Sequence, residues 1–546
     1  MLRRDFLSVS AFALTGNVAG SGPSQVTGAL KSILDYGAKP DGKTLNTSAI
    51  QRMIDDVSNA GGGVVYAPPG IFLVGGLELK SRVTLYLEAG CILLGSTSIA
   101  DYSYHPGPPM QGDENGHHLL FARSAEDVAL CGLGVIDGQG SSYWERVYRA
   151  PVPPENQWRD VATWDYRVKN NNRRPSPMVE FAQCHNVHIS GITLKNSAGW
   201  TLRPVNCDTV VIDGICIRNP CFGPNCDGID ITASSNVFIS NCEIATGDDA
   251  ICLKSESPYG GAVLPTRNIT ITNCTLTTSC NGFKIGTATV GAFENIVFSN
   301  SVIYSDPVPI NARVIGGISI EMVDGGTVDG VVVSNIRMEN VRAPIFVRLG
   351  ERRRKEGTFL RDVLIDGVDA TGAIITSSIT GVPDLRLSDI TVSNCRIRTM
   401  EQGQAEWIRR EIPEVANQYP EAWMMGRLPA YGFFVRHADR VRLRNVECIT
   451  DMPDARPAIV CDDAEDLIFT GVELSAPTGD AALIELRNTR RAFLTGMRMP
   501  QGTKVLARVS GAGSSSISLV GNSLENGQQV AVCTDGATRQ ALTPAK

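Results

Sequence analysis

The chain has 546 residues, an apolar fraction of 43% and a formal net charge of −7 at pH 7. The length is compatible with several average domains or with one repetitive all-β unit, so the periodicity of the sequence has to decide between them. A protein that binds nucleic acid neutralises phosphates with an excess of basic residues. The acidic balance therefore excludes nucleic acid as a partner.

The first residues resemble a twin-arginine export signal. Arg3 and Arg4 precede a short run of small and apolar residues in the stretch LRRDFLSVSAFALTG. Such segments are removed on export and are excluded from reasoning about the fold. We therefore expect a signal peptide over residues 1–22, with an ordinary N-terminal tail as the alternative, and a periplasmic or secreted mature protein. No later apolar run is long enough to span a bilayer.

An amphipathic helix is predicted near the start of the mature chain. Residues 47–63 (TSAIQRMIDDVSNAGGG) have apolar side chains at helical spacing, with Asn46 or Thr47 as the N-cap and the glycines as the stop. A protein built from stacked repeats has to cover its open ends. We expect this helix to cap the N-terminal end, within a segment over residues 23–127 that also holds the first coils.

A short phrase recurs through the rest of the chain. Each copy alternates apolar residues, turns at Asn, Gly or Asp, and continues into a second short strand. Most copies are spaced by about 25 to 35 residues, as in solenoids. We predict an all-β fold, a right-handed parallel β-helix over residues 128–535, in preference to a β-sandwich or a propeller. The copies begin at residues 127, 186, 209, 236, 268, 295, 330, 362, 389, 440, 466 and 516.

The cysteines follow the same repeat. Cys242, Cys274 and Cys395 occupy equivalent places in the phrases SNCEI, TNCTL and SNCRI, where a small buried apolar side chain is needed. Only Cys221 and Cys226, which flank a Gly-Pro turn, are candidates for a disulfide. The odd total of 15 leaves at least one thiol outside any such bridge.

Two stretches about one short coil apart contain three aspartates. NCDGIDI begins at residue 225 and GDDAICLKS at residue 247, so that Asp227 and Asp248 are 21 residues apart. Adjacent coils stack about 4.8 Å apart, which places Asp227, Asp248 and Asp249 in one patch on the outer face. Carboxylates this close raise the pKa of at least one member, which then holds a proton while its neighbours stay ionised. Glycoside hydrolysis requires one acid and one base that face the bond.

Two other readings of these aspartates stay open. Asp and Asn also terminate strands, as at Asp213 and Asp366, and three carboxylates can bind a hard cation such as calcium. The presence of both motifs in register favours catalysis over a turn role. The glycines beside the aspartates are expected to let a sugar ring approach the backbone.

These motifs resemble glycoside hydrolase family 28, the polygalacturonase family, together with NSAGWTLRPVNCDTVVIDGI before them and with DYGAKPDGKTLNTSAIQ and GGGVVYAPPG near the start. The resemblance runs from Asp35 to the last coils. It implies a hydrolase that inverts the anomeric configuration without a metal or another cofactor. By motif, Asp248 would be the general acid, Asp227 and Asp249 would hold and deprotonate the attacking water, and Asn225 would orient this arrangement.

Two further motifs of that family are altered. Asn281 stands where the family's Gly-His-Gly has histidine, and Ser319-Ile320-Glu321 stands where it has Arg-Ile-Lys. A glutamate there would repel the carboxylate of a uronic acid, which needs a guanidinium or ammonium group. Either other cations bind that carboxylate, with Lys284, Arg348 and the charged loop at residues 350–357 as candidates, or the sugar at that subsite is neutral. Relatives that act on rhamnogalacturonan make the second option credible, and a solvated loop is the alternative for 350–357.

Residues 400–436 interrupt the repeat with aromatic residues and prolines. We expect an excursion between coils, helical in part and folded over one face, which either packs or contributes to the substrate site. His437 follows it directly and is a candidate for contact with the substrate. Trp200 and Trp423 are candidates for stacking on sugars or for core packing. His188 lies on a predicted strand, where we expect it to be packed or hydrogen-bonded.

The sequence favours an exported, monomeric hydrolase of pectic polysaccharides or oligosaccharides. A polysaccharide lyase on the same fold would need calcium and a basic residue next to a carboxylate. A carbohydrate-binding protein without activity would account for the altered motifs. The two aspartate motifs favour the hydrolase over both alternatives.

Overall fold

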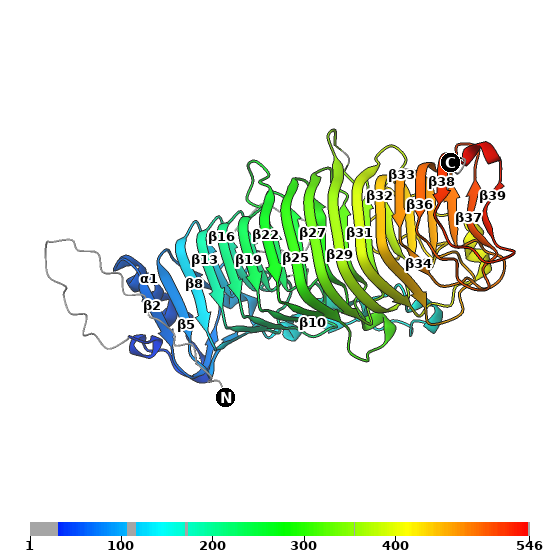
Figure 1. Cartoon of the computed structure of the whole chain (residues 1–546). Helices are drawn as coiled ribbons and strands as arrows, with labels where there is room; N and C mark the ends of the chain where they lie inside the picture. Colours follow the sequence, from blue (N-terminus) through cyan, green and yellow to red (C-terminus); the bar gives the residue numbers. More distant parts are fainter. Residues whose placement is uncertain (1–30, 106–115, 170–172, 354, 544–546) are drawn as a thin grey trace, which may run out of the picture. The chain divides into compact units, whose positions relative to one another are not determined.

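Among the residues that the structure describes, parallel strands stack in register along three ladders, which together join 37 strands in one continuous sheet. The computed structural model describes residues 31–105, 116–169, 173–353 and 355–543. Figure 1 shows the strands following one another coil by coil from β2 (Gly63–Ala67) to β39 (Gln529–Thr534). The predicted parallel β-helix is confirmed, with the right-handed winding that parallel crossovers adopt. The predicted signal peptide, residues 1–22, lies outside the described residues.

Ladder 1 contains every copy of the recurring phrase, so the repeat read in the sequence is the repeat of the fold. Its strands are longer from β25 to β32, where the second short strand of the phrase joins the first without a break, and they are short again at β36 and β38. Ladder 1 consists of β2, β5 (Val83–Leu87), β8 (Glu126–Gly132), β13 (His185–Ser190), β16 (Asp208–Asp213), β19 (Ser235–Ser240), β22 (Thr266–Thr272), β25 (Ala292–Tyr304), β27 (Thr327–Glu339), β29 (Phe359–Ala373), β31 (Leu387–Thr399), β32 (Phe433–Thr450), β33 (Ile459–Thr470), β36 (Arg490–Thr495) and β38 (Ser515–Val520).

Ladder 2 holds the short strands that follow the turn in each coil. From β25 onwards its positions are taken by the second halves of the long strands of ladder 1. Ladder 2 consists of β1 (Asp41–Leu45), β3 (Gly70–Val74), β6 (Cys91–Gly95), β9 (Val135–Asp137), β14 (Thr193–Lys195), β17 (Cys216–Arg218), β20 (Glu243–Thr246), β23 (Thr275–Thr278) and, near the end, β34 (Glu473–Leu474).

Ladder 3 is the face on which both aspartate motifs lie, and most residues of its strands from β12 to β30 are buried on both sides, whereas β39 is not. It ends with the first residues of β32 and β33 and with three later strands. Ladder 3 consists of β4 (Leu77–Leu79), β7 (Leu120–Arg123), β12 (Val179–Ala182), β15 (Leu202–Val205), β18 (Ile229–Thr232), β21 (Ile251–Ser255), β24 (Asn281–Thr289), β26 (Gly316–Met322), β28 (Ala343–Leu349), β30 (Ser377–Thr380), β32, β33, β35 (Ile484–Arg487), β37 (Val505–Ser510) and β39.

The helix α1 (Thr47–Asn59) covers the first coil, as predicted. It buries Ile50, Met53 and Ile54 against the interior and ends before three glycines in the left-handed region of φ. Asn46 is the N-cap residue, although its side-chain oxygen accepts from the Lys39 amide instead of a helix amide. The remaining helices are short 3₁₀ turns: η1 (Ile33–Tyr36), η2 (Ile99–Asp101), η3 (Gly140–Tyr143), η4 (Pro154–Asn156), η5 (Ala162–Asp165), η7 (Ile310–Ala312), η8 (Ala405–Arg409) and η9 (Arg539–Ala541).

Asparagines stack from coil to coil at the turns of ladder 1. Asn268 donates to Asn236 at 2.9 Å, and Asn295 donates to Asn268 at 3.2 Å. These three residues have φ between +53° and +56°, a left-handed conformation that Asn tolerates better than most residues. The repeated Asn therefore both bends the chain and links each coil to the next.

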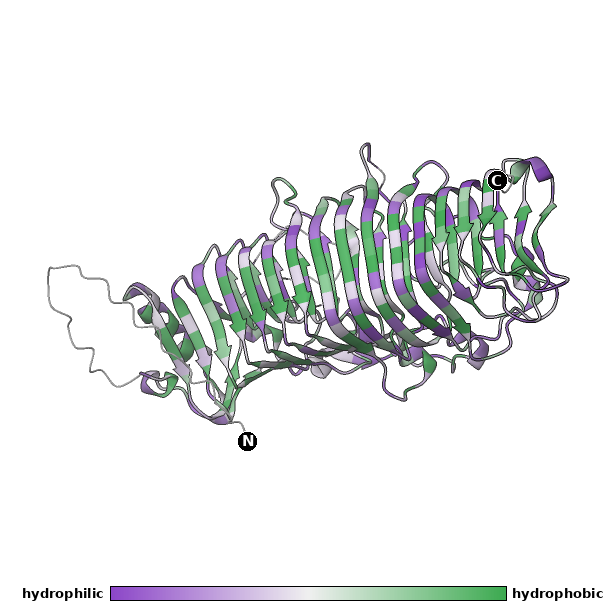
Figure 2. Ribbon diagram, viewed as in Figure 1, coloured by the Kyte–Doolittle hydropathy of each residue, from purple (hydrophilic) through white to green (hydrophobic). Residues whose placement is uncertain are grey.

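The core is a continuous column of Val, Ile, Leu and Phe inside the coils. Figure 2 shows hydrophobic and hydrophilic residues alternating along the strands, and in strands such as β5 every second residue is buried. Cys242, Cys274 and Cys395 are buried in this column, as predicted. Cys221 is exposed and Cys226 is buried, and the structure joins neither of them in a disulfide.

The predicted excursion leaves the ladder after β31 and returns at β32, so it spans residues 400–432. Only η8 is helical in it. The division expected near residue 127 falls inside β8, which pairs in register with both β5 and β13. Within the described residues, no helix combines the length and apolar character that a membrane crossing requires.

Replacing an interior aromatic residue should weaken the fold much more than replacing an outward one. Phe298 in β25 is fully buried and stacks on Phe283 at 4.8 Å, whereas Phe238 in β19 is 46% exposed. We expect Phe298→Ala to lower the free energy of unfolding by about 3 to 5 kcal/mol. The matched control Phe238→Ala should change it little. Denaturant titration followed by circular dichroism measures both, and equal midpoints would contradict the assignment of the two faces.

Candidate active site

Three polar side chains form one row at the start of successive ladder 3 strands. Asp227, Asp249 and Asn281 each come two residues before equivalent paired positions of β18, β21 and β24. Because the register between these strands does not shift there, the three residues lie on adjacent coils about 4.8 Å apart. The prediction that both aspartate motifs lie side by side is confirmed. Asp248 precedes Asp249 and shares its loop.

Glycines beside the aspartates are required by the packing of the backbone. A methyl carbon at Gly228 would lie 2.3 Å from the carbonyl oxygen of Ala250, on the next coil. One at Gly247 would lie 2.5 Å from the carbonyl oxygen of Gly223. These glycines let neighbouring loops approach each other, which replaces the expectation that they admit a sugar ring.

Asp249 is held as a carboxylate. The Asn281 amide donates to its Oδ1 at 2.9 Å, and Lys284 Nζ lies 3.1 Å from its Oδ2. Burial by itself would raise the pKa of Asp249, but the charges of Lys284 and Lys254 and the Asn281 hydrogen bond outweigh burial and lower it. Asp249 therefore stays ionised at neutral pH.

Asp248 is in the opposite state. Burial, and then the neighbouring Asp249 carboxylate, raise its pKa to about 7. The backbone N–H of Asp249 donates to Asp248 Oδ1 at 2.9 Å and so orients the carboxyl group. Two adjacent residues in one loop thus supply a group that holds a proton and a group that accepts one.

Asp227 is 5% exposed, and its pKa is raised well above the ordinary value by burial and then by Asp230 and Asp248. Lys254 offsets this only in part, because its Nζ lies 4.0 Å from Asp227 and 2.8 Å from Asp230. Burial and the neighbouring carboxyls therefore favour the protonated form of Asp227 before substrate binds. Asn225, two residues earlier, is exposed and has φ +53° at the turn.

The altered family motifs meet in one buried ion cluster. Lys284 Nζ lies 3.4 Å from Glu321 Oε2 as well as 3.1 Å from Asp249, and both Lys284 and Glu321 are buried. Burial raises the pKa of Glu321 well above its usual range. The Ser319 hydroxyl donates to the side-chain Oδ1 of Asn281 at 3.0 Å. Glu321 thus balances a lysine inside the protein and does not face the groove as an isolated charge.

Arg348 and His437 are not brought together with the aspartates. Arg348 in β28 donates to the carbonyl oxygens of Gly381 at 2.9 Å and Glu414 at 2.6 Å. His437 in β32 contacts Asp463 at 2.7 Å through Nδ1 and Glu414 at 3.2 Å through Nε2. Both residues therefore belong to the surface on which the 400–432 excursion rests.

The structure also shows the positions of the remaining candidates, two tryptophans and one histidine. Trp200 is buried, and Lys254 Nζ lies 4.8 Å from the centre of its ring. Trp423 packs edge-on against Trp164. His188 is exposed on ladder 1 and pairs with Asn186 at 2.9 Å. Trp200 alone of these supports the aspartate row, because it holds the lysine beside Asp227.

Sequence reasoning missed two residues of the excursion. Lys284 Nζ donates to the Tyr419 hydroxyl at 3.4 Å, and the Tyr419 ring is 53% exposed. Glu421 is buried, and burial raises its pKa to about 7, with Asp249 and Asp248 acting in the same direction. The local sequence QYPEAW, an aromatic and an acid in a polar segment, was the available signal.

A metal would compete with lysine at this site. Asp248, Asp249 and Cys280 each place one ligand atom within 4.8 Å of the others. A hard cation such as calcium prefers six to eight oxygen ligands. Here one of the three ligand atoms is sulfur, and both oxygens of Asp249 already contact Asn281 and Lys284. The donor set does not fit calcium.

Comparison with known proteins identifies relatives of the chain. The model of the glycosyl hydrolases family 28 matches residues 68–404. A probable polygalacturonase of Vitis vinifera is 28% identical over 393 residues, which cover 67% of this chain and 74% of the relative. An endo-polygalacturonase of Pectobacterium parmentieri is 28% identical over 351 residues, 63% and 80% of the two chains.

Among solved structures, an exopolygalacturonase from Thermotoga maritima superposes with a TM-score of 0.59 at 23% identity, over 77% of this chain and 91% of that one. This likeness shows the shared right-handed β-helix. The family match ends at residue 404, so most of the 400–432 excursion and the last coils lie beyond it.

Proposed function

The chain belongs to the glycosyl hydrolases family 28 and is a polygalacturonase-like glycosidase, and we propose that it hydrolyses pectic polysaccharides or oligosaccharides with inversion. One observation carries the proposal: Asp248 has a pKa of about 7, whereas that of Asp249, beside it, is lowered. Such a pair supplies the acid and the base that hydrolysis of a glycosidic bond needs.

In the proposed reaction, water attacks the anomeric carbon as the bond to the leaving oxygen breaks. Asp248 gives its proton to that oxygen, and Asp249 takes a proton from the water. Asp227, protonated before binding, orients the water by hydrogen bonding together with Asn225. Lys284 holds Asp249 ionised until the water is bound. Proton exchange with solvent then restores both carboxyls.

A neutral sugar next to the cleaved bond is the second candidate, and it has a specific basis. Three cations near the aspartates have acidic partners: Lys254 contacts Asp230, Lys284 contacts Asp249 and Glu321, and Arg352 contacts Asp324. A uronate would have to compete with these acids for a cation. Rates on homogalacturonan and rhamnogalacturonan oligosaccharides decide between the two, since only the first offers uronates on both sides of every bond.

Product analysis separates hydrolysis from the other functions. We expect saturated products of inverted configuration by anomeric NMR, formed equally well with a chelator. Unsaturated, ultraviolet-absorbing products that disappear with the chelator would identify a lyase. Binding without any product would identify a carbohydrate-binding protein.

Export is proposed on the basis of residues 1–22. Mass determination of the protein recovered from its native host should show a new N-terminus near residue 22, and replacement of Arg3 and Arg4 by lysine should leave the precursor uncleaved. A mature chain that begins at residue 1 would contradict export by this route.

Asp248→Asn should abolish most of the activity and leave the fold intact. The variant removes the proton donor, which typically contributes a factor of about 10² to 10⁴ to the rate. Asp480→Asn, at a side chain that is 83% exposed, is the matched control. We expect kcat to fall only in the first variant, with unchanged circular dichroism in both. Retained activity in Asp248→Asn would show that the motifs only close turns.

The rate should be lost as the pH rises through about 7. Only protonated Asp248 can donate, and its pKa is about 7. On the acid side, the pKa of Asp249 is lowered from 3.8, so the base stays ionised until the pH is strongly acid. A profile of kcat/KM from about pH 4 to 9 measures the basic limb and should show no loss of rate as the pH falls towards 4. A profile that stays flat through neutral pH would exclude Asp248 as the acid.

A further inference from the structure

Ladder 3 is covered on its outer face beyond the aspartates. Side chains that point away from the core at the register of Lys284 are fully buried on the following coils. On ladder 1 of the same coils, outward residues such as Leu364 are exposed. Something therefore lies on ladder 3 where a long substrate would continue. These buried residues are Ser319, Phe346, Ser378, Phe434 and Val460.

The covering segment is residues 400–432, which we call the strap. Its carbonyl oxygens accept from Arg487 at Ile408 (2.8 Å), from Arg436 at Ile412 (2.8 Å) and from Arg348 at Glu414 (2.6 Å). These arginines belong to β35, β32 and β28 in that order. The strap therefore runs across the strands towards the aspartates, along the direction in which a bound polysaccharide would extend.

The strap passes beside the aspartate row in its middle part, before it returns to β32. Tyr419 reaches Lys284, which contacts Asp249. Ala422 then packs in one apolar cluster with Cys280 and Phe346. The strap thus fills the groove from β35 back to β24, next to the carboxylates.

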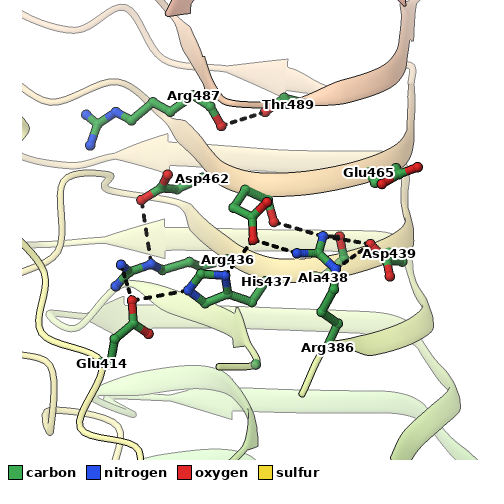
Figure 3. Close-up of polar contacts among 12 residues, drawn as sticks. Arg386, Glu414, Arg436, His437, Ala438, Asp439, Asp462, Glu465, Arg487 and Thr489 are labelled. Atoms are coloured by element: carbon green, nitrogen blue, oxygen red, sulfur yellow. Dashed lines mark hydrogen bonds and ion pairs between the residues drawn. The ribbon is translucent and has the colours of Figure 1, made fainter. Parts of the chain in front are cut away.

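Apolar and ionic contacts hold the strap in place. Ile412, Met425 and Leu428 form a cluster with Phe434 and Val460. Figure 3 shows the ionic part, in which Glu414 contacts both Arg436 and His437 on β32. A strap with a packed apolar underside and partly buried ion pairs is part of the fold and not a mobile lid.

His437 is held in turn from below. Its Nδ1 lies 2.7 Å from Asp463, which also contacts Arg386 at 2.5 Å. Arg386 reaches Asp439 at 2.7 Å (Figure 3). The residue predicted to touch substrate therefore joins the strap to β33.

The other flank of the aspartates is covered as well. Tyr259, in the loop between β21 and β22, contacts Glu180 on β12 through its hydroxyl, and Arg123 lies 4.6 Å from the centre of its ring. Glu180 and Arg203, which point outwards on β12 and β15, are buried as an ion pair. The carboxylates thus lie between two covered stretches of ladder 3.

We propose that the strap closes the groove beyond Lys284, so that the enzyme removes sugars from chain ends and does not cut within chains. A pocket closed along the ladder admits an end, whereas an open groove admits the middle of a polymer. The inference rests on the proposed hydrolysis of pectic glycans and specifies its mode.

The length of the first products tests this mode. The protein is incubated with homogalacturonan and rhamnogalacturonan, and products are sized from the first turnovers while viscosity is followed. We expect one short product throughout and a viscosity that falls late. An early mixture of oligosaccharides of many intermediate lengths would overturn the inference, whereas the proposed hydrolase function would remain supported. No product from any pectic glycan would overturn the proposed function and this inference with it.

Oligosaccharides with a bulky fluorescent group at both ends test the closed pocket directly. The labels should lower kcat/KM by about tenfold or more, the effect of a steric penalty near 1.4 kcal/mol. Tyr419→Ala shortens the tip of the strap at an exposed side chain and should recover part of that rate. The control Phe238→Ala, an exposed aromatic residue on ladder 1, should recover none. Equal rates on labelled and unlabelled substrates would overturn the inference.

Discussion

The in-register stacking of parallel coils is the constraint on which the rest of the structure depends. Because neighbouring coils are about 4.8 Å apart and pair residue by residue, any side chain is placed directly beside its equivalents above and below. The same rule places Asn268 on Asn236 at the turns and Asn281 beside Asp249 at the site. Polar residues that would be far apart in another fold therefore form a continuous row here. The residue types at those positions determine which reaction the row can support.

Such a row can collect charge only if each charge is balanced within one or two coils. The motif departures read in the sequence, asparagine for histidine and glutamate within the Arg-Ile-Lys position, make sense as one exchange. Glu321 places a buried carboxyl group, whose pKa burial raises, 3.4 Å from Lys284 on the adjacent coil, and Lys284 also contacts Asp249. The charged pair is Lys284 and Asp249, and removing one partner of a buried pair leaves an uncompensated charge, which costs about 3 to 5 kcal/mol. The lysine therefore preserves an ionised Asp249. This compensation argues against loss of activity.

Much of the fold was predictable because the recurring phrase repeats in the sequence at the spacing of the coils. The copies that begin at residues 127 to 516 all lie on ladder 1, and α1 begins at Thr47 as expected. The proximity of Asp227, Asp248 and Asp249 was predictable from the coil length. What could not be predicted depends on contacts between distant segments. His437 looked available for substrate, yet it is held by Asp463 and by Glu414 from an irregular segment with no period of its own. Tyr419 reaches Lys284 across 135 residues of chain, a contact that no local pattern encodes.

The irregular segment, residues 400–432, distinguishes this protein from a plain β-helix. The solenoid repeats the same groove on every coil, so the scaffold by itself sets no limit to the length of chain that it binds. A limit needs a segment that departs from the repeat and lies across several coils. Residues 400–432 do so, because their backbone carbonyl oxygens accept hydrogen bonds from arginines on β28, β32 and β35. Arginine suits this purpose because its guanidinium offers several donors in a fixed geometry and stays charged when buried. The cations that a sugar-binding groove would present to substrate therefore hold the strap instead. The strap, and not the ladder, then determines the length of substrate that the groove accepts.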